Sequence, residues 1–219
     1  MWSPADLIIL VPMLGRSHRV EPLLASIQAA TPGAGVLFMV TPEDVDVRDA
    51  VGHAGGRHLL VPWRPIGDYA RKINEGIAHT TEPLIFTGAD DIHFHPGWFE
   101  KACSQLDERA GVVGTWDMSN RRTKWDHSTH SLVTREYARL GTIDQPGRLL
   151  HEGYPHEYVD DELVGTAKHR KAYRHCRGAV VEHLHPMVGK APTDELYDAQ
   201  ADRMAVGRVL FNERRKLWT

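Results

Sequence analysis

Two adjacent carboxylates, Asp90 and Asp91, follow a short apolar run and are the clearest candidates for chemistry in this sequence. The run at 84–86 is rich in strand formers, and the small residues at 87–89 let a ligand approach the backbone closely. Ligands of open α/β sheets bind at the carboxyl ends of strands, where paired carboxylates suit a hard divalent cation that also holds phosphate oxygens. The alternative is an Asp turn that merely caps the helix expected near Trp98. We expect a cation site here.

Histidine is the second source of candidate chemistry, because the chain carries 14 of them and several fall close together. His183 and His185 alternate on a segment expected to be extended, so they share one face if the strand is regular. Imidazole is a competent metal ligand, which makes this pair a candidate for completing a metal site. His93 and His95 also alternate, but we interpret them as part of a surface turn after the acidic pair. We assign no role to the histidines of the irregular second half, which are His127, His130, His151 and His156.

The first half of the chain must position the acidic pair, and it alternates short apolar runs with helical patterns. The expected strands are 7–11, 36–40, 58–61 and 84–86. Helices are expected through 20–27, over 46–53, and from Gly67 through Ile77. This order predicts an α/β fold with a mostly parallel sheet and right-handed crossovers.

The second half is less regular. Strands are expected at 111–115, 131–134 and 179–181, and helices at 135–140, 159–171 and 194–217. The segment 141–158 carries Gly, Pro and His without periodicity, which is typical of a long functional loop. A regular half followed by a loop-rich half suggests a binding scaffold with an acceptor side built on it.

Composition limits the class of protein. The 219 residues, 42% hydrophobic and 25% charged, fit one soluble globular domain. A net charge of −3 does not indicate binding to a polyanion such as nucleic acid, although it is compatible with a local basic groove. The two cysteines show neither a metal spacing nor a disulfide framework, which favours a reducing cytoplasm. We expect no membrane span and no secretion signal.

The order of these parts resembles the inverting family 2 glycosyltransferases, which have the GT-A fold. The resemblance extends from about residue 7 to about residue 186. The segments that carry it are 8–12, 70–76, Ala89-Asp90-Asp91, 160–163 and 181–183. The chain is also similar to small glycosyltransferases of phages of actinobacteria, which would place it in the host cytoplasm. The family resemblance implies a single domain over 1–219. Within it, residues 1–110 would bind the nucleotide sugar, residues 111–190 would form the acceptor and catalytic half, and residues 191–219 would form a C-terminal helix.

The resemblance implies a nucleotide-sugar donor, foremost a UDP-sugar, and a divalent cation, Mn²⁺ or Mg²⁺, that neutralises the leaving diphosphate. The metal ligands would be Asp91, His183 and His185. The donor-binding residues would lie along the strand ends and on the helix before the central strand: Pro12, Leu14, Arg16, Thr41, Asp44, Lys72, Asn74, Ala89 and Asp90. The chain departs from the family at Ala89, where an Asp-x-Asp motif has its first acid, and at the turn after the second strand, which is less acidic.

Transfer to a hydroxyl also needs a base that removes the acceptor proton. The resemblance points to the acidic group at 160–162, at an expected helix start. We favour Asp160 as the base, with Asp161 as the second candidate. Capping and the helix dipole would also explain these acids, and both roles can apply to different members of the group.

Three other classes of function stay open. A nucleotidyltransferase would also use an acidic metal loop on a nucleotide-binding scaffold. A metal-dependent hydrolase could use Asp90, Asp91, His183 and His185 around two metals. A non-catalytic binding module would tolerate the loss of these acids.

The acceptor is expected to offer a free hydroxyl, and a modified DNA base or a virion protein would fit a phage setting. DNA is the minority hypothesis: base flipping needs aromatic and basic groups around the pocket, and the residues that could supply them could equally pack a loop. The candidates for that role are Trp116, Arg121, Arg122, Lys124 and Trp125.

Overall fold

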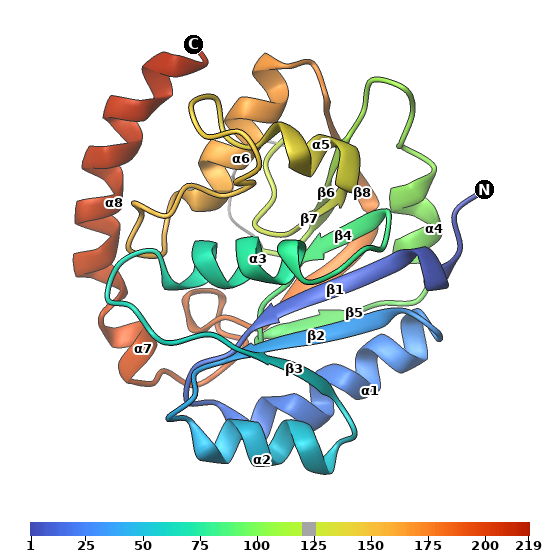
Figure 1. Cartoon of the computed structure of the whole chain (residues 1–219), viewed down its shortest axis with the longest axis vertical. Helices are drawn as coiled ribbons and strands as arrows, with labels where there is room; N and C mark the ends of the chain where they lie inside the picture. The colour runs from blue at the N-terminus through green and yellow to red at the C-terminus, as the bar shows by residue number, and fades with distance from the viewer. Residues whose placement is uncertain (120–125) are drawn as a thin grey trace.

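A computed structural model of the chain describes residues 1–119 and 126–219 and has an α/β fold (Figure 1). Its first half contributes four parallel strands, β1 (Leu7–Pro12), β2 (Gly35–Val40), β3 (Arg57–Leu60) and β4 (Leu84–Thr87). The crossover helices between them are α1 (Val20–Ala30), α2 (Val45–His53) and α3 (Asp68–Ala78). These elements lie where the alternation of apolar runs and helical patterns predicted them.

The second half extends the same sheet with β5 (Ile92–Phe94), β6 (Val112–Trp116), β7 (Ser131–Thr134) and β8 (Tyr173–His183). The strand order among the described residues is β3-β2-β1-β4-β7-β6-β8-β5. β7 and β5 run antiparallel to their neighbours, whereas β6 and β8 pair in parallel. The helices of this half are α4 (Trp98–Cys103), α5 (Arg135–Leu140), α6 (Val159–His169), α7 (Glu195–Asp198) and α8 (Gln200–Arg214). The prediction of a mostly parallel sheet with flanking helices is confirmed, and the antiparallel pairs of β7 and β5 make the sheet mixed.

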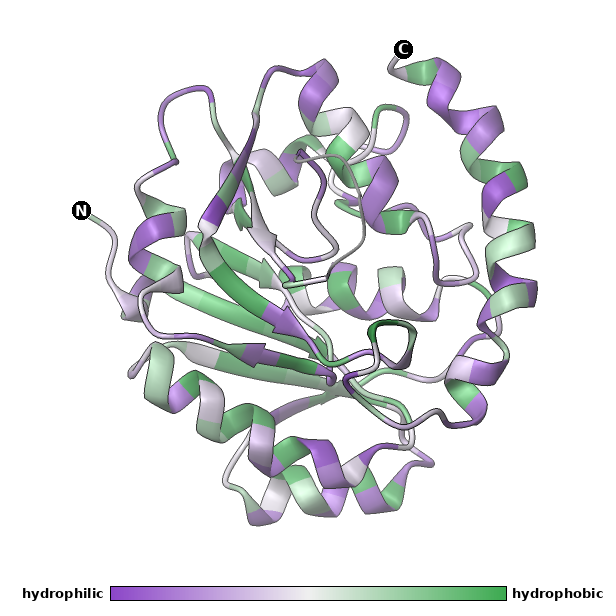
Figure 2. Cartoon of the chain, turned by 180° about the vertical axis from the view of Figure 1, so that it is seen from behind, coloured by the Kyte–Doolittle hydropathy of each residue, from purple (hydrophilic) through white to green (hydrophobic). Residues whose placement is uncertain are grey.

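Apolar side chains fill both faces of the sheet, and β1 explains how. Successive residues of a strand point to opposite faces, so Leu7 and Ile9 enter the core under α1, α2 and α4, while Ile8 and Leu10 enter the core under α3, α5 and α6. Figure 2 shows hydrophobic residues along the central strands. Because both faces are covered, the free edge for binding is the row of carboxyl strand ends.

Two sequence expectations about strands are corrected. The surface turn expected around His93 is instead β5, in which Ile92 and Phe94 are buried and only His93 between them is exposed. The strand expected at 179–181 is the end of the much longer β8, which pairs with β6 and then with β5. Its first part carries polar residues, and backbone pairing with β6 holds it in the sheet without an apolar pattern.

The single helix expected over 194–217 is also corrected, because the chain forms α7, α8 and a 3₁₀ turn at 215–217. Asp194 caps α7 by accepting a hydrogen bond from the Tyr197 amide (3.1 Å). α8 is held elsewhere: Arg214 donates to Glu162 on α6 (2.7 and 2.8 Å) and to Asp144 (2.8 and 2.9 Å). The C-terminal region is thus two helices, α7 capped at its start and α8 anchored at its end.

The anchor of α8 also fixes the start of α6, which carries the acidic residues 160–162. Glu162 is fully buried and accepts from both Arg214 and the Tyr154 hydroxyl (2.7 Å). Gly207 lies so close to the carbonyl of Glu157 that an added Cβ would be 3.0 Å from it. The third acid of the predicted group is therefore a structural residue, which leaves Asp160 and Asp161 for chemistry. None of the helices in the described ranges has the length and apolar character needed to cross a membrane.

Candidate active site

The chain leaves β4 close to β1, and this close approach sets the position of the acidic pair. The Gly88 amide donates to the Leu10 carbonyl (2.9 Å), and a Cβ on Gly88 would lie only 2.8 Å from that oxygen. The Tyr69 hydroxyl of α3 donates to the Gly88 carbonyl from the other side (3.1 Å). Asp90 and Asp91 therefore emerge at the carboxyl edge of the sheet, as predicted, and both are buried.

Asp91 is paired with His183 at the end of β8. Asp91 Oδ2 lies 3.1 Å from His183 Nε2, and the Leu184 amide donates to the Asp91 carbonyl (2.7 Å). Burial acts to raise the pKa of Asp91, but the charge and hydrogen bond of His183 outweigh it and hold that pKa well below the usual range. Burial likewise opposes the charge on His183, yet Asp91 raises the pKa of His183. The pair is thus an ion pair that joins two strand ends.

The atoms of this pair fit two ligands of one divalent cation. Two ligands at right angles in an octahedral shell with bonds of about 2.1 Å lie about 3.0 Å apart, and the Asp91–His183 separation is 3.1 Å. Once His183 gives up its proton, its neutral imidazole and the Asp91 carboxylate can both bind one divalent cation and still leave positions for phosphate oxygens. His185 lies next to this pair, with ring centroids 5.0 Å apart, but its Nδ1 accepts from the Met187 amide (3.1 Å). The structure brings the three predicted metal ligands together, with His185 turned toward the following turn.

Asp90 faces the first loop rather than the Asp91–His183 pair. Its Oδ1 accepts from Arg16 Nη1 (3.2 Å), and Arg16 also binds both oxygens of Asp194 (2.8 and 2.9 Å). Burial and the neighbouring charge of Asp91 raise the pKa of Asp90, against the opposing charge of Arg16. The positive charge of Arg16 therefore partly balances the acidic pair from the side of β1.

The other predicted donor residues line the same edge or support it from behind. Pro12, Leu14 and Ala89 are half-buried along the strand ends. Asp44 accepts from the Gly15 amide (2.6 Å) and caps α2. The Lys72 ammonium is fully buried and donates to the Met13 carbonyl (2.9 Å) and to Thr41 Oγ1 (3.0 Å), beside Asp68 (2.8 Å). Lys72, Thr41 and Asp44 thus hold the loop after β1, and their contact with a donor stays a prediction.

Asn74 has a comparable supporting role in the second half of the chain. Its side-chain amide donates to the Leu150 carbonyl (2.8 Å) and accepts from the Leu150 amide (3.1 Å). The side chain is buried in these contacts. It therefore fixes the long loop 141–158 to α3.

A second cluster, which we call the α6 acidic cluster, consists of Asp160, Asp161 and His127. His127 Nε2 lies 3.4 Å from Asp160 Oδ2, and His127 Nδ1 lies 3.9 Å from Asp161 Oδ1. Among the described residues, these three form the group of His, Cys, Asp and Glu whose ligand atoms lie close enough to share an ion. Burial opposes ionisation of Asp160, but His127 and the backbone amides at the start of α6 lower its pKa, whereas burial and the charge of Asp160 raise the pKa of Asp161. Asp160 is the better-stabilised carboxylate of the two.

His130 lies between the two clusters. Its Nδ1 bonds to the Thr87 carbonyl (2.9 Å), and its ring packs edge-on against His183 at a centroid distance of 5.2 Å. Burial and the nearby charge of His183 lower the pKa of His130 to about 4, so the ring is neutral. The charge of Asp160 also acts on both His130 and His183. The candidate base therefore lies within electrostatic reach of the candidate cation site.

Folding stability should depend on pH through His127. Burial acts to lower its pKa, but the bond to Asp160 outweighs it and raises the pKa from 6.5 to about 8. A raised histidine pKa contributes stability that is present below pH 6.5 and is lost as the pH rises through 8. Between pH 6 and pH 9, the free energy of unfolding should fall by roughly 1–2 kcal/mol more in the parent protein than in His127→Gln. Urea unfolding of both proteins at the two pH values measures this difference, and parallel pH profiles would contradict it.

Several residues of the site escaped the sequence analysis. Tyr197 donates its hydroxyl to Asp91 Oδ2 (2.7 Å), and Asp194 binds Arg16. Both come from a region interpreted only as a C-terminal helix. The sequence places His127 only in an irregular loop, and nothing in its neighbourhood in sequence points to Asp160. The positions 121, 122, 124 and 125, considered for DNA contacts, lie outside the described residues.

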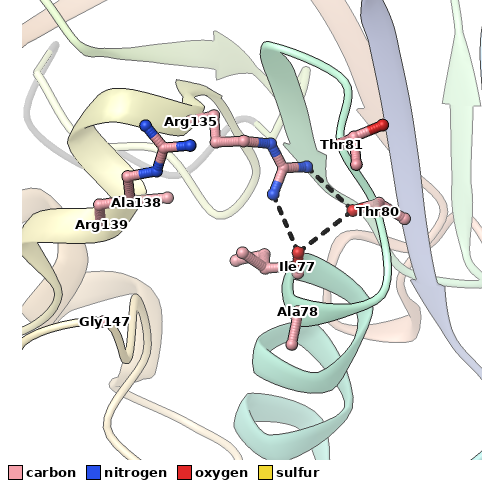
Figure 3. Close-up of a pocket in the computed structure, with 8 residues that line it drawn as sticks. All are labelled: Ile77, Ala78, Thr80, Thr81, Arg135, Ala138, Arg139 and Gly147. Atoms are coloured by element: carbon pink, nitrogen blue, oxygen red, sulfur yellow. Dashed lines mark hydrogen bonds between the residues drawn. The ribbon is translucent and has the colours of Figure 1, made fainter.

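A pocket elsewhere on the molecule involves none of the predicted site residues (Figure 3). It lies at the amino end of β4, between the end of α3 and α5. Arg135 donates there to the Ile77 carbonyl (2.9 Å), the Thr80 hydroxyl (2.9 Å) and the Glu82 carbonyl (2.6 Å). The bond to Ile77 satisfies one of the last carbonyls of α3, and the other two hold the turn between α3 and β4, which is a structural role.

Comparison with known proteins supports the fold. No protein-family model matches the sequence, and no curated protein matches it. A mannosyltransferase from Pyrobaculum calidifontis, solved in complex with GDP-Man and Mn²⁺, is similar at a TM-score of 0.65 and 18% identity over 94% of this chain. This chain spans 64% of the length of that protein. A glucosyl-3-phosphoglycerate synthase from Mycobacterium tuberculosis, solved with Mn²⁺, UDP and phosphoglyceric acid, has a TM-score of 0.61 at 14% identity, covering 94% of this chain and 77% of that one. The likeness establishes a GT-A-like fold.

Proposed function

We propose that this chain, which has a GT-A-like fold, is a glycosyltransferase that moves a sugar from a nucleotide-diphosphate sugar to an acceptor hydroxyl. The observation that carries the proposal is the Asp91–His183 pair at the carboxyl end of β4, with the α6 acidic cluster within electrostatic reach. The solved mannosyltransferase with GDP-Man and Mn²⁺ and the synthase with UDP and Mn²⁺ support the same class of donor. A UDP-sugar is the first donor to test, and a GDP-sugar is the second.

Asp91 and His183 would hold the cation, Mn²⁺ or Mg²⁺, with His185 as a further ligand. The cation, when bound, neutralises the charge that develops on the departing diphosphate. Arg16 would add a positive charge at the same edge, next to Asp90. The loop after β1, held by Lys72 and Asp44, would carry the nucleotide base. These residues bind and orient the donor, and Ala89 leaves room beside them.

The acceptor would be activated by Asp160, with Asp161 as the second candidate. The acceptor hydroxyl gives its proton to the carboxylate while its oxygen forms a bond to the anomeric carbon. The bond from that carbon to the diphosphate oxygen breaks, and the nucleoside diphosphate leaves. Attack from the face opposite the leaving group inverts the anomeric configuration. Protonated His127 beside Asp160 keeps the carboxylate ionised before the proton arrives.

The acceptor is proposed to be a hydroxyl on a macromolecule such as a modified DNA base or a virion protein. DNA is the less favoured of the two. Of the residues considered for base flipping, Trp116 lies in the described part, and its ring is covered by Arg177 at 5.1 Å. Salt-sensitive retention on modified but not on plain duplex DNA would support the DNA acceptor, and equal retention would count against it.

Product analysis tests the proposed reaction. The protein is incubated with UDP- and GDP-sugars and manganese, and release of nucleoside diphosphate and free or transferred sugar is followed. We expect nucleoside diphosphate from one donor class. Pyrophosphate release from a nucleoside triphosphate would instead indicate a nucleotidyltransferase, and phosphate release from simple phosphate esters would indicate a metal-dependent hydrolase. Either of these without sugar transfer contradicts the proposal.

A further inference from the structure

The segment 186–199, which we call the strap, lies against the acidic pair and contacts Asp91 itself and Arg16, the partner of Asp90. Tyr197, on α7, donates its hydroxyl to Asp91 Oδ2 (2.7 Å). The Tyr197 ring lies between Arg16, whose Cζ is 4.0 Å from the ring centroid, and His185, whose ring centroid is 4.6 Å away. The strap therefore has a side chain at the centre of the candidate donor site.

Asp194 makes the second contact of the strap. Its two carboxylate oxygens accept from Nε and Nη2 of Arg16 (2.8 and 2.9 Å), the bidentate geometry that a guanidinium also offers to a phosphate group. The same carboxylate accepts from the Tyr197 amide (3.1 Å), so the two contacts are made by one short helix. The Asp194 carboxylate is thus bound to the Arg16 guanidinium, which would otherwise face an anionic donor.

These contacts resemble those that a donor with its cation would make. The Tyr197 hydroxyl donates a hydrogen bond to Asp91 Oδ2, which is the oxygen that pairs with His183 and is suited to bind a cation. A carboxylate takes up Arg16 in place of a phosphate, and a flat ring stacks on that guanidinium. A cation on Asp91 Oδ2 and the Tyr197 hydroxyl compete for the same oxygen.

The strap is attached to the molecule mainly through such polar contacts. No side chain between residues 186 and 199, all of which are described, is buried. Lys190 pairs with Glu182 (2.7 Å) near the start of the strap, and Thr193 bonds to Asp198 within it (2.6 Å). A segment without buried apolar side chains opens at a small cost in free energy, because little surface has to be exposed.

We propose that the strap is an autoinhibitory latch: before ligands bind, Tyr197 and Asp194 occupy the cation and phosphate positions, and they leave when the cation and the nucleotide bind. The identity of the displaced ligand rests on the proposed function. The latch itself concerns only the competition for Asp91 and Arg16. It makes the apparent affinity for the cation and nucleotide lower than that of the open site by the fraction of open molecules.

The test uses Tyr197→Phe and Asp194→Asn in the full-length chain. Tyr197→Phe removes a hydrogen bond to a charged group and keeps the ring, so binding of manganese with UDP or GDP should tighten on the order of tenfold. Asp194→Asn should tighten the same binding by a similar factor. Tyr137→Phe, on α5, is the matched control, because its hydroxyl accepts from Arg170 (3.4 Å) and bonds to no residue of the acidic pair or the strap, and it should bind like the parent.

Three probes are titrated by calorimetry: manganese alone, manganese with UDP, and manganese with GDP. Amide hydrogen exchange over 194–199 is followed in parallel. The latch predicts faster exchange when the ligands bind to the parent protein, and fast exchange in Tyr197→Phe without ligand. Tighter binding of manganese alone to Tyr197→Phe would support the latch. If neither nucleotide binds to any variant in the same experiment, the latch stands but the proposed nucleotide-sugar donor is wrong.

The opposite pattern would overturn the latch. If Tyr197→Phe binds more weakly and exchange over 194–199 slows on binding, the strap closes over the donor as part of its site. If affinity and exchange match those of Tyr137→Phe, the contacts are structural, and nucleotide binding by the parent would leave the proposed function standing. Absence of manganese binding in every variant would overturn both.

Discussion

Asp91→Asn should nearly abolish sugar transfer. The substitution removes the charge that pairs with His183 and would hold the cation, so the departing diphosphate is no longer neutralised. A cation of this kind contributes several kcal/mol to the transition state, which corresponds to a loss in turnover on the order of 10³-fold or more. The measurement is initial velocity with manganese at saturating donor, beside a melting curve that confirms folding.

Two control variants separate this effect from a general loss of charge. Asp49→Asn makes the same change on the exposed face of α2, and it should retain full turnover. His93→Ala removes an exposed imidazole on β5, two residues from Asp91, and should have little effect. Normal turnover of Asp91→Asn would show that Asp91 is not a ligand of a catalytic cation.

Asp160→Asn should reduce turnover by roughly 10²–10⁴-fold, which is the usual contribution of general-base catalysis. A base acts only in the transition state, so donor affinity should be nearly unchanged. The amide keeps the size of the side chain and can still accept the backbone hydrogen bonds at the start of α6. A purely capping role therefore predicts a modest loss of stability and almost no loss of rate.

The matched variant for this test is Asp161→Asn, one residue further along α6. Its carboxylate is more exposed than that of Asp160, at 40% against 25%, and lies farther from His127. We expect a clearly smaller loss of turnover. If Asp161→Asn is inactive and Asp160→Asn is active, Asp161 is the base and Asp160 is not. If both variants are fully active, the cluster has a structural role only.

The parts of the fold that depend on local pattern were predictable. β1 and β2 are continuous apolar runs because both faces of a parallel strand are covered, and this signal does not depend on distant residues. The position of Asp91 follows from the same logic, since it comes directly after β4 and ligands gather at carboxyl strand ends. The pairing of Asp91 with His183 was accessible through the family resemblance.

Other features depend on contacts that no local pattern records. Tyr197 reaches Asp91 across 106 positions of sequence, and His127, a few residues before β7, lies against Asp160 at the start of α6. The first part of β8 is polar and joins the sheet through backbone pairing with β6. α7 and α8 are held by distant partners at their outer ends, Asp194 by Arg16 and Arg214 by Glu162. Tertiary contacts overrode local propensity at each of these places.

Calorimetric titration of UDP- and GDP-sugars into the unmodified protein, once with manganese and once with EDTA, tests the central claim most directly. The site at Asp91 and His183 predicts binding of one donor class with manganese and a large loss of affinity in EDTA. Equal affinity in manganese and EDTA, or no binding of any sugar nucleotide, would contradict the claim that this edge of the sheet is a cation-dependent donor site.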